Sequence, residues 1–400
     1  MKPLLTGIQV LEISSVVLGP LAGQILGDLG ASVVKIEPLD GEIARASHPG
    51  VGGNGALYLS NNRNKKAIAI DLKTEAGKAV ARRMIASSDI FLHNMRIEAV
   101  ERLGLGFDAA AELNPRLIYC SAIGFGQQGR YRDRPAFDDI IQAASGLAGL
   151  AEGLGEEPRF IPTILADKIG ALYAVYGILA ALVARERGRE KAIHIQVPMF
   201  EAMASFVLNE HLAEATFKND GSVGYPRVLA RDRRPYRTRD GWIAVLPYTA
   251  EQWRRFFCEV GRADICDEAW FSDPHSRSER LDDLYAVVSS VLAERTTPEW
   301  VETLSRLDVP CSPVTRLDDL LHDPHLADVG FFNVGDNYPP EIKRTLPQPV
   351  LFDEVDTLPD TPPPLLGADT REVLRSFHYD DREIASMIAA GVVRQQGAEK

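Results

Sequence analysis

The sequence is poor in cysteine and shows no pattern of metal ligands. Its 400 residues include four cysteines, none with C-x-x-C spacing, and eight histidines that form no ligand cluster. This distribution argues against a disulfide framework and predicts no metal site. Scattered cysteines suit a reducing compartment, so we expect a cytoplasmic protein.

Long apolar runs are also missing. The longest stretch, 169–184, is shorter than the roughly 18 to 20 residues that cross a bilayer. We interpret it as a buried core helix. At the N-terminus, Thr6, Gln9 and Glu12 interrupt the apolar pattern, so we expect no secretory signal and no membrane partner.

Positive charge is in short supply. The formal net charge is -12 at pH 7 and the isoelectric point is about 5.3. This balance argues against nucleic acid as a partner, and a polyanionic small molecule would need a local basic pocket. With 45% hydrophobic residues, the chain is long enough for a large core and two or three domains.

The glycine motifs of nucleotide-binding proteins are absent or incomplete. The patterns G-x-x-x-x-G-K-[ST] and G-x-S-x-G do not occur, and G-x-G-x-x-G occurs as GFGQQG at 124–129. A strand pattern precedes it, but RYRDRPAF follows and cannot open a tightly packed helix. The expected acidic residue is also missing, because the chain reads SGLAGL there. We interpret the glycines as residues that bring a loop close to a ligand or to other backbone, or that simply make turns.

What the sequence does contain is an alternation of strands and helices. An apolar strand pattern at 7–13 is followed by helical spacing at 21–30 and a second strand pattern at 31–38. Alternation of this kind predicts a mainly parallel, doubly wound α/β sheet, which binds ligands at the carboxyl ends of its strands. Further strands are expected at 67–72, 89–94 and 116–123, and a helix with Thr74 as its N-cap at 74–88.

The pattern of the sequence changes after Gly188. The polar, glycine-bearing segment 217–235 indicates a domain boundary, and the Asp240-Gly241 pair predicts a turn before a strand. A helix should follow at 250–261, and a last helix at 369–377 has Asp369 as its candidate N-cap.

Asp167 stands immediately before the apolar helix, which places its carboxylate at the edge of the core. Two interpretations are open. Asp167 is either an N-cap that stabilises the helix by about 1 kcal/mol, or a nucleophile held against a cleft, since ionised carboxylates can form covalent intermediates.

Five blocks carry a resemblance over nearly the whole chain. In order, LGPLAGQILGDLGASVVKIEP, NRNKKAIAIDLKTEAGKAV, VERLGLGFDAAAELNPRLIYCSAIGFGQQG, ADKIGALYAVYGILAAL and PPPLLGADTREVL resemble the family III coenzyme A transferases, or CaiB/BaiF family. The resemblance implies a Rossmann-like large domain at 1–215, a smaller α/β domain at 216–334 and a segment at 335–400 that returns to the large domain. It also implies an interlocked homodimer.

The same resemblance implies a reaction. Asp167 matches the catalytic aspartate, which attacks an acyl-CoA to form a mixed anhydride and then becomes an aspartyl-CoA thioester. A carboxylic acid acceptor finally takes the coenzyme A. In the family, coenzyme A is a substrate and no cofactor is tightly bound. Its binding positions are matched here by Val17, Leu18, Ile70, Leu72, Lys73, Asn94, Met95 and Arg102.

Charged residues at these positions have a second interpretation. Lys73 and Arg102 are either phosphate partners or solvated surface charges. A cluster formed by Arg63, Lys65 and Lys66 is expected to add local positive charge.

The chain departs from the family at several positions. Pro38 stands where the family has a phosphate-binding arginine, and His93 stands where it usually has glutamate. His93 is either a partly buried strand-end residue or a proton-transfer group. Gly221 and Gly224 are the glycines present where some members have a glycine-rich flap. The basic segment that follows either binds acyl carboxylates or is a solvated linker; it contains Arg227, Arg231, Arg233 and Arg234.

Two other functions compete with CoA transfer. An α-methylacyl-CoA racemase needs an acid and a base on opposite faces of the α-carbon of its substrate. Racemases have a G-H-D block, and this chain has Phe137 at the position of the histidine, which leaves no group there to transfer a proton. Asp138 either fills that role or is the N-cap of the helix that follows. The third hypothesis is a non-catalytic CoA-binding protein.

Overall fold

The computed structural model describes residues 2–332, 334, 336–355 and 360–396. The chain forms two compact units. The first contains 1–147, 160–206 and 330–400, and the second contains 148–159 and 207–329. Compactness alone does not define an independently folding domain, so the limits 1–215, 216–334 and 335–400 stay a prediction.

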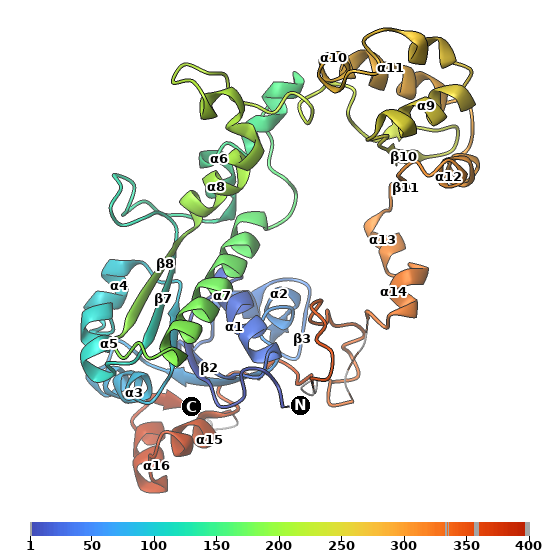
Figure 1. Ribbon diagram of the computed structural model, residues 1–400. Helices are drawn as coiled ribbons and strands as arrows, with labels where there is room; N and C mark the ends of the chain where they lie inside the picture. The colour runs from blue at the N-terminus through green and yellow to red at the C-terminus, as the bar shows by residue number, and fades with distance from the viewer. Residues whose placement is uncertain (1, 333, 335, 356–359, 397–400) are drawn as a thin grey trace. The chain divides into compact units, whose positions relative to one another are not determined.

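A seven-stranded sheet forms the centre of the first unit (Figure 1). Six strands are parallel, and the edge strand β12 pairs antiparallel with β5. The mainly parallel sheet predicted from the sequence is confirmed. Across the sheet the order is β12 (Val393–Arg394), β5 (Lys65–Ile70), β2 (Ser32–Glu37), β1 (Gln9–Ile13), β6 (Ile90–His93), β7 (Ile118–Ile123) and β8 (Ile193–Pro198).

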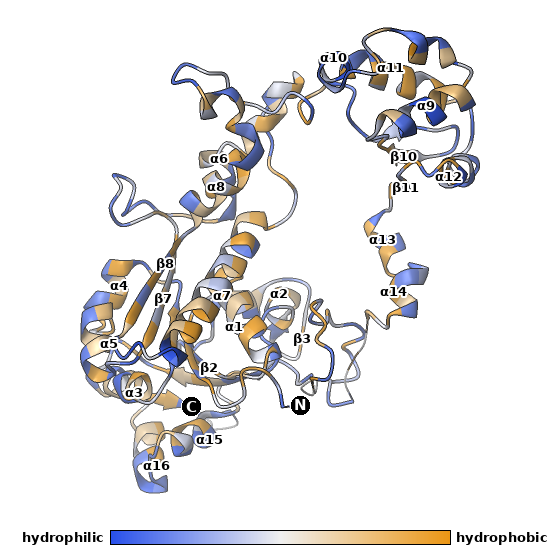
Figure 2. Ribbon diagram, viewed as in Figure 1, coloured by the Kyte–Doolittle hydropathy of each residue, from blue (hydrophilic) through white to orange (hydrophobic). Residues whose placement is uncertain are grey.

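Helices cover both faces of this sheet. On one face, α1 (Leu18–Asp28) and α7 (Leu165–Glu186) pack against strand residues such as Val10 and Ile118. The opposite face carries another core around Phe91. Figure 2 shows mostly hydrophobic residues along the sheet and α7. The helices of the second core are α3 (Glu75–Ala86), α4 (Ile97–Arg102), α5 (Phe107–Leu113), α15 (Thr370–Ser376) and α16 (Asp381–Ala389).

Helix α7 contains the longest apolar run. Its 22 residues make it the one helix in the described chain that is long and apolar enough to cross a membrane by length and composition. It packs against α1, β7, β8 and α6 (Asp138–Ala144), which is the behaviour of a core helix. Leu172 and Tyr176 on its other side are exposed.

The second unit has a small antiparallel sheet of its own. The Asp240-Gly241 turn connects β9 (Tyr236–Arg237) to β10 (Trp242–Val245), as predicted, and β11 (Cys311–Pro313) pairs on the other side. An aromatic core that includes Trp253 and Trp300 supports it. Its main helices are α9 (Ala250–Glu259), α10 (Pro274–Glu279), α11 (Leu281–Leu292) and α12 (Thr297–Arg306).

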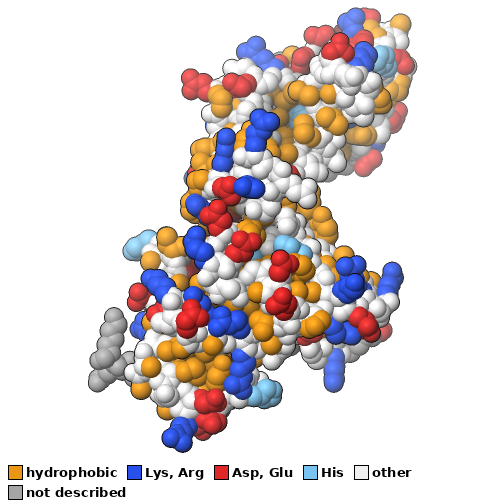
Figure 3. Space-filling model, turned by 90° about the vertical axis from the view of Figure 1, so that its left-hand side faces the viewer, with side chains coloured by type: hydrophobic (Ala, Val, Ile, Leu, Met, Phe, Trp, Pro, Cys, Tyr) orange, Lys and Arg blue, Asp and Glu red, His pale blue; other side chains and the backbone are white. Residues whose placement is uncertain are grey.

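Further helices and strands complete the two units. A two-stranded sheet pairs β3 with β4, and α8 runs from the first unit into the second. Charged side chains of both signs are intermixed on the face shown in Figure 3. The remaining elements are η1 (Ile43–Ala46), β3 (Gly50–Val51), β4 (Asn54–Gly55), α2 (Ala56–Leu59), η2 (Ala148–Leu154), α8 (Met199–His211), η3 (Ala213–Thr216), η4 (Ala263–Asp267), α13 (Leu317–Leu320) and α14 (Pro324–Asp328).

The two candidate caps behave differently. The Thr74 side chain accepts a hydrogen bond from the Gly77 N–H at 3.0 Å, so this prediction is confirmed. Asp369 occupies the N-cap position of α15 but makes no capping bond. Its carboxylate instead accepts the Ala67 N–H at 2.8 Å, which ties α15 to β5.

A buried ion cluster lies within β1, β2, β5 and the segment after β2. Lys35 Nζ is 3.0 Å from Glu12 Oε1 and 3.1 Å from Glu42 Oε1, and Lys65 Nζ is 2.8 Å from Glu12 Oε2. Burial lowers the pKa of Lys65 to about 8, although Glu12 opposes that shift. Burial alone would raise the pKa of Glu12, but the two lysines hold it below its usual value.

The cluster makes a testable contribution to stability. Lys35→Met should lower the free energy of unfolding by about 3–5 kcal/mol, because it leaves buried carboxylates without a partner. Lys66→Met is the matched control, since Lys66 pairs with Glu372 at the surface, where such pairs contribute about 1 kcal/mol or less. Urea denaturation followed by circular dichroism measures both. Equal losses in the two variants would contradict the prediction.

Candidate functional site

The strand order of the large sheet reverses between β1 and β6. From β1, the strands β2 and β5 follow on one side, and β6, β7 and β8 on the other. Open parallel sheets bind ligands at such a reversal, beyond the carboxyl ends of the strands. The loops at this point are 14–17 after β1 and 94–96 after β6.

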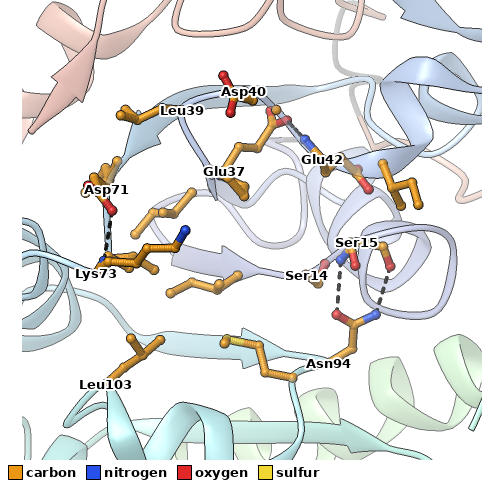
Figure 4. A pocket seen from close by; sticks show the side chains of 18 residues that line it. Ser14, Ser15, Glu37, Leu39, Asp40, Glu42, Asp71, Lys73, Asn94 and Leu103 are labelled. Carbon is orange, nitrogen blue, oxygen red and sulfur yellow. Dashed lines mark hydrogen bonds between the residues drawn. The ribbon is translucent and has the colours of Figure 1, made fainter. Parts of the chain in front are cut away.

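The Asn94 side chain joins these two loops. Its Oδ1 accepts the Ser15 N–H at 3.0 Å, and its Nδ2 donates to the Ser15 carbonyl at 2.8 Å (Figure 4). Both backbone groups of Ser15 are therefore held by one side chain from the neighbouring strand.

Val16, the next residue, has a strained backbone. Its φ of 70° lies in the left-handed region, which is unfavourable for a β-branched residue and costs about 1–3 kcal/mol. The Val16 N–H donates to Glu42 Oε2 at 2.8 Å. Strain of this kind is typical of functional sites, where the surrounding structure maintains it.

A cavity of about 530 Å³ opens beside these loops, and we call it the Lys73 cavity. The Lys73 side chain extends into it in Figure 4, and the backbone N–H of Lys73 donates to Asp71 Oδ1 at 3.0 Å. Five of the eight predicted coenzyme A positions line this cavity: Ile70, Leu72, Lys73, Asn94 and Met95.

The charge lining the Lys73 cavity is mostly acidic. Glu37 and Glu42 are neutralised by Arg45 and Lys35, at 2.6 Å and 3.1 Å. Among the described lining residues, the charges without an ion pair are then Asp40, Asp71 and Lys73. Pro38 lines the same cavity and supplies no cation.

A second cavity, of about 240 Å³, contains Asp167 and shares Ser15, Asn94 and Met95 with the first. We call it the Asp167 cavity. The two cavities are therefore neighbours on either side of these three residues. The other residues that line the Asp167 cavity include Val16, Leu18, Gly124, Phe137, Arg96, Arg132 and Arg134.

Asp167 is the third residue of α7, and the N-cap is Ile164, so its interpretation as the N-cap is wrong. The Asp167 side chain is only 8% exposed. Burial, and secondly the negative charge of Asp138, raise the pKa of Asp167 to about 6, while a hydrogen bond from the Leu18 N–H opposes the rise. At neutral pH this carboxylate is therefore mostly ionised and poorly solvated, as a nucleophile requires.

Asp138 is bonded to the same segment. Its Oδ1 accepts the Asp167 N–H at 3.1 Å, and its Oδ2 accepts from Gln142 Nε2 at 2.7 Å. Asp138 is the first residue of α6, after the N-cap Phe137, so its interpretation as the N-cap is also wrong.

Three predicted coenzyme A positions lie outside the Lys73 cavity. Val17 is buried and is the N-cap residue of α1. Leu18 lines the Asp167 cavity. Arg102 is exposed at the end of α4, next to Leu103, which lines the Lys73 cavity.

His93 is fully buried behind the site. Its Nε2 lies 3.0 Å from Ser121 Oγ, which is also 3.0 Å from His194 Nε2. Burial, and secondly His194, lower the pKa of His93 to about 3, so it stays neutral at physiological pH. These contacts favour the structural interpretation of His93, although it is more deeply buried than predicted.

Two glycines of GFGQQG permit close approach, although to side chains and not to the backbone or ligand that the sequence suggested. A Cβ on Gly124 would lie 2.3 Å from Ala136 Cβ, and one on Gly126 would lie 2.3 Å from Glu201 Oε1. The Gly126 N–H donates to Glu201 at 2.9 Å. Turns follow the motif and the next helix begins at Asp138, so the segment is not a dinucleotide fingerprint.

The expected basic cluster at 63–66 is wrong. Arg63 forms a hydrogen-bonded ion pair with Asp28, Lys65 is buried against Glu12, and Lys66 pairs with Glu372. Each positive charge is thus neutralised by a partner far away in the sequence, which local composition does not show.

The other basic segment belongs to the second unit. Arg227 stacks on the Tyr248 ring at 4.3 Å, and Arg234 lies 3.3 Å from Asp232. Gly221 and Gly224 belong to the same unit. Their roles at the site stay predictions.

The similarity to known proteins defines the class. A family model described as CoA-transferase family III matches residues 5–370. The chain therefore belongs to CoA-transferase family III, whose members transfer coenzyme A between acyl-CoA thioesters and carboxylic acids.

Individual relatives match over almost their full length. The chain is 28% identical to the (R)-2-hydroxy-4-methylpentanoate CoA-transferase of Clostridioides difficile, covering 98% of this chain and 100% of that protein. It is 29% identical to the human succinyl-CoA:glutarate CoA-transferase, covering 98% and 90%.

Solved structures agree with these matches. A CaiB/BaiF family protein from Brucella suis superposes with a TM-score of 0.79 at 26% identity, covering 94% of this chain and all of that one. Rv3272 from Mycobacterium tuberculosis gives a TM-score of 0.79 at 28% identity, with coverages of 92% and 99%.

The raised pKa of Asp167 predicts how stability depends on pH. Its folded pKa of about 6 exceeds the ordinary value of 3.8, so the folded state binds more protons between these values. The contribution of Asp167 to the free energy of unfolding should therefore fall by about 1–3 kcal/mol as the pH rises from 4 to 7. Asp167→Asn lacks this carboxyl and should gain stability relative to the wild type over the same range. A difference that does not change with pH, measured by urea denaturation, would contradict the assignment.

Proposed function

We propose that this protein is an acyl-CoA:carboxylate CoA-transferase in which Asp167 is the covalent nucleophile. The observation that carries the proposal is the buried carboxylate of Asp167 in a cavity that shares Ser15, Asn94 and Met95 with the Lys73 cavity. A coenzyme A chain in the Lys73 cavity would bring its thioester to the shared residues, within reach of Asp167.

The first half of the reaction loads the enzyme. An Asp167 oxygen attacks the thioester carbonyl, the carbon–sulfur bond breaks, and coenzyme A leaves as the thiolate. The product is a mixed anhydride between Asp167 and the acyl group. The thiolate then attacks the aspartyl carbonyl, the donor acid leaves as a carboxylate, and an aspartyl-CoA thioester remains.

The second half runs the same steps with the acceptor. Its carboxylate attacks the aspartyl-CoA carbonyl and expels the thiolate, and the thiolate attacks the acceptor carbonyl of the new anhydride. Asp167 is released as a carboxylate. One thioester is exchanged for another, so no ATP is required.

The binding roles that we propose rest on the resemblance to the family, supported by the linings of the two cavities. Ile70, Leu72 and Met95 would contact the apolar parts of coenzyme A. Asn94 would hold the loop 14–17 beside the thioester of the bound substrate. Lys73 and Arg102 would meet the phosphates, because ionised donors form the stronger bonds to phosphate. Val17 and Leu18 would contact the ligand through the backbone at the start of α1.

Several broader expectations belong to the same proposal. The parallel strand order supports a Rossmann-like large domain. We further propose an interlocked homodimer in the cytoplasm, with no tightly bound cofactor. Stable dimers at micromolar concentration in sedimentation experiments would agree with this assembly.

The racemase alternative has one supporting observation, the closeness of a second carboxyl group, Asp138, to Asp167. Asp138 already accepts hydrogen bonds from the Asp167 N–H and from Gln142. Phe137, which lines the Asp167 cavity, has no proton to transfer. These contacts favour CoA transfer over racemisation.

Mass spectrometry tests the proposal directly. The purified protein is incubated with a panel of acyl-CoA thioesters and then with hydroxylamine, which converts an activated aspartate into a hydroxamate. We expect a hydroxamate at Asp167. No adduct with any donor, together with solvent deuterium at the α-carbon of a 2-methylacyl-CoA, would establish the racemase instead.

The matching variant is Asp167→Asn. It should reduce turnover by roughly 10³-fold or more, because the amide cannot replace the carboxylate nucleophile. Asp139→Asn is the control: Asp139 is exposed on α6 and should leave the rate unchanged. Full activity of Asp167→Asn would instead support a non-catalytic role for this residue.

A further inference from the structure

The loop between β1 and α1 has an arrangement that its own sequence does not explain. Val16 keeps a φ of 70° although neither it nor its neighbours Ser15 and Val17 are glycine. A valine in this conformation relaxes to negative φ unless other groups prevent it.

Side chains from two other segments prevent the relaxation. Asn94 binds both backbone groups of Ser15, and Glu42 Oε2 accepts the Val16 N–H at 2.8 Å. Glu42 is thus the group that touches the strained residue itself.

Glu42 is in turn fixed by charge. Its Oε1 is 3.1 Å from Lys35 Nζ, and Lys35 also donates to the Ser14 carbonyl at 2.8 Å. The Glu42 N–H donates to Glu37 Oε2 at 3.0 Å. The Glu42 side chain is buried, so it cannot exchange these partners for water without opening the fold.

The strained turn leads directly to the reacting carboxylate. Val17 is the N-cap of α1, and the next residue, Leu18, lines the Asp167 cavity together with Val16 and Asp167, with its N–H acting on the Asp167 carboxylate. A Cβ on Gly19 would lie 2.3 Å from Ser14 Cβ, so the turn is packed tightly against the start of the helix. A change at Val16 therefore moves the Leu18 N–H.

We propose that Glu42 is a positioning residue, which holds the strained Val16 turn so that the Leu18 N–H meets the Asp167 carboxylate. The inference rests on the proposed function of Asp167. Glu42 does not touch the reacting atoms, and it acts through the backbone of residues 16–18.

The kinetic test compares Glu42→Ala with Glu42→Gln. Glu42→Ala removes the acceptor of the Val16 N–H and should lower kcat about 10- to 100-fold, as a displacement of about 1 Å can. The KM for acyl-CoA should change less than about threefold, since most of the Lys73 cavity is untouched. Glu42→Gln keeps one oxygen for the Val16 N–H but turns an amide group toward Lys35, so it should lose stability while retaining more of kcat than Glu42→Ala. Glu112→Ala, an exposed glutamate on α5, controls for the lost charge.

The pH profile gives a second readout. Loss of the Leu18 hydrogen bond removes the interaction that lowers the pKa of Asp167, so the midpoint of the acylation rate should move to higher pH in Glu42→Ala. An unchanged midpoint together with an unchanged kcat would overturn the inference.

Relief of the strain provides the decisive comparison. Glycine adopts positive φ without strain, so Val16→Gly should rescue much of the kcat lost in Glu42→Ala. If Glu42→Ala fails to fold, the double variant should fold. A double variant as impaired as Glu42→Ala would show that Glu42 acts through the ion cluster alone, and would overturn the proposal.

Failure of the proposed function gives a different result. If the wild type forms no adduct at Asp167 with any acyl-CoA, both proposals are overturned. An adduct in the wild type with normal turnover in Glu42→Ala overturns only the role of Glu42.

Discussion

The pairing of buried charges is the constraint on which the site depends. Glu12, Lys35 and Lys65 lie on three adjacent strands and have almost no access to water. Ionised groups in such surroundings must stay paired, because the penalty for an isolated buried charge is large. The strands beneath the site therefore cannot shift relative to one another, and Glu42, the fourth member, extends this rigidity to the turn at Val16.

The same pairing of buried charges explains why the Lys73 cavity has few unpaired cations. Most cations near the Lys73 cavity are used in internal ion pairs, which leaves Lys73 to face a ligand beside Asp40 and Asp71. The net charge of -12 on the whole chain adds to the negative potential of Asp40 and Asp71. Attraction of a polyanion to this cavity is accordingly local, and its strength depends on the ionic strength of the solution.

Much of the fold was accessible from sequence because its signals are local. Strand patterns, the Thr74 cap and the apolar run of α7 depend on neighbouring residues, and the structure has all of them. Two errors are local: Asp167 and Asp138 lie inside the first turns of α7 and α6 and are not N-caps. The other errors concern partners distant in sequence. The sequence predicts free charges at Arg63 and Lys65, whereas in the folded chain they pair with Asp28 and Glu12. Asp167 was identified by resemblance, but its contact with Asp138, 29 positions earlier, has no local signature.

The C-terminal segment completes the sheet. Strand β12 pairs with β5, Asp369 holds the Ala67 N–H, and the Thr361 N–H donates to Asn64 Oδ1 at 2.7 Å. Residues separated by some three hundred positions therefore meet along one edge. During synthesis on the ribosome, this edge of β5 stays unpaired until Val393 and Arg394 have emerged, more than three hundred residues after β5. An open strand edge is prone to pairing with other chains, so β5 is exposed to aggregation throughout that interval.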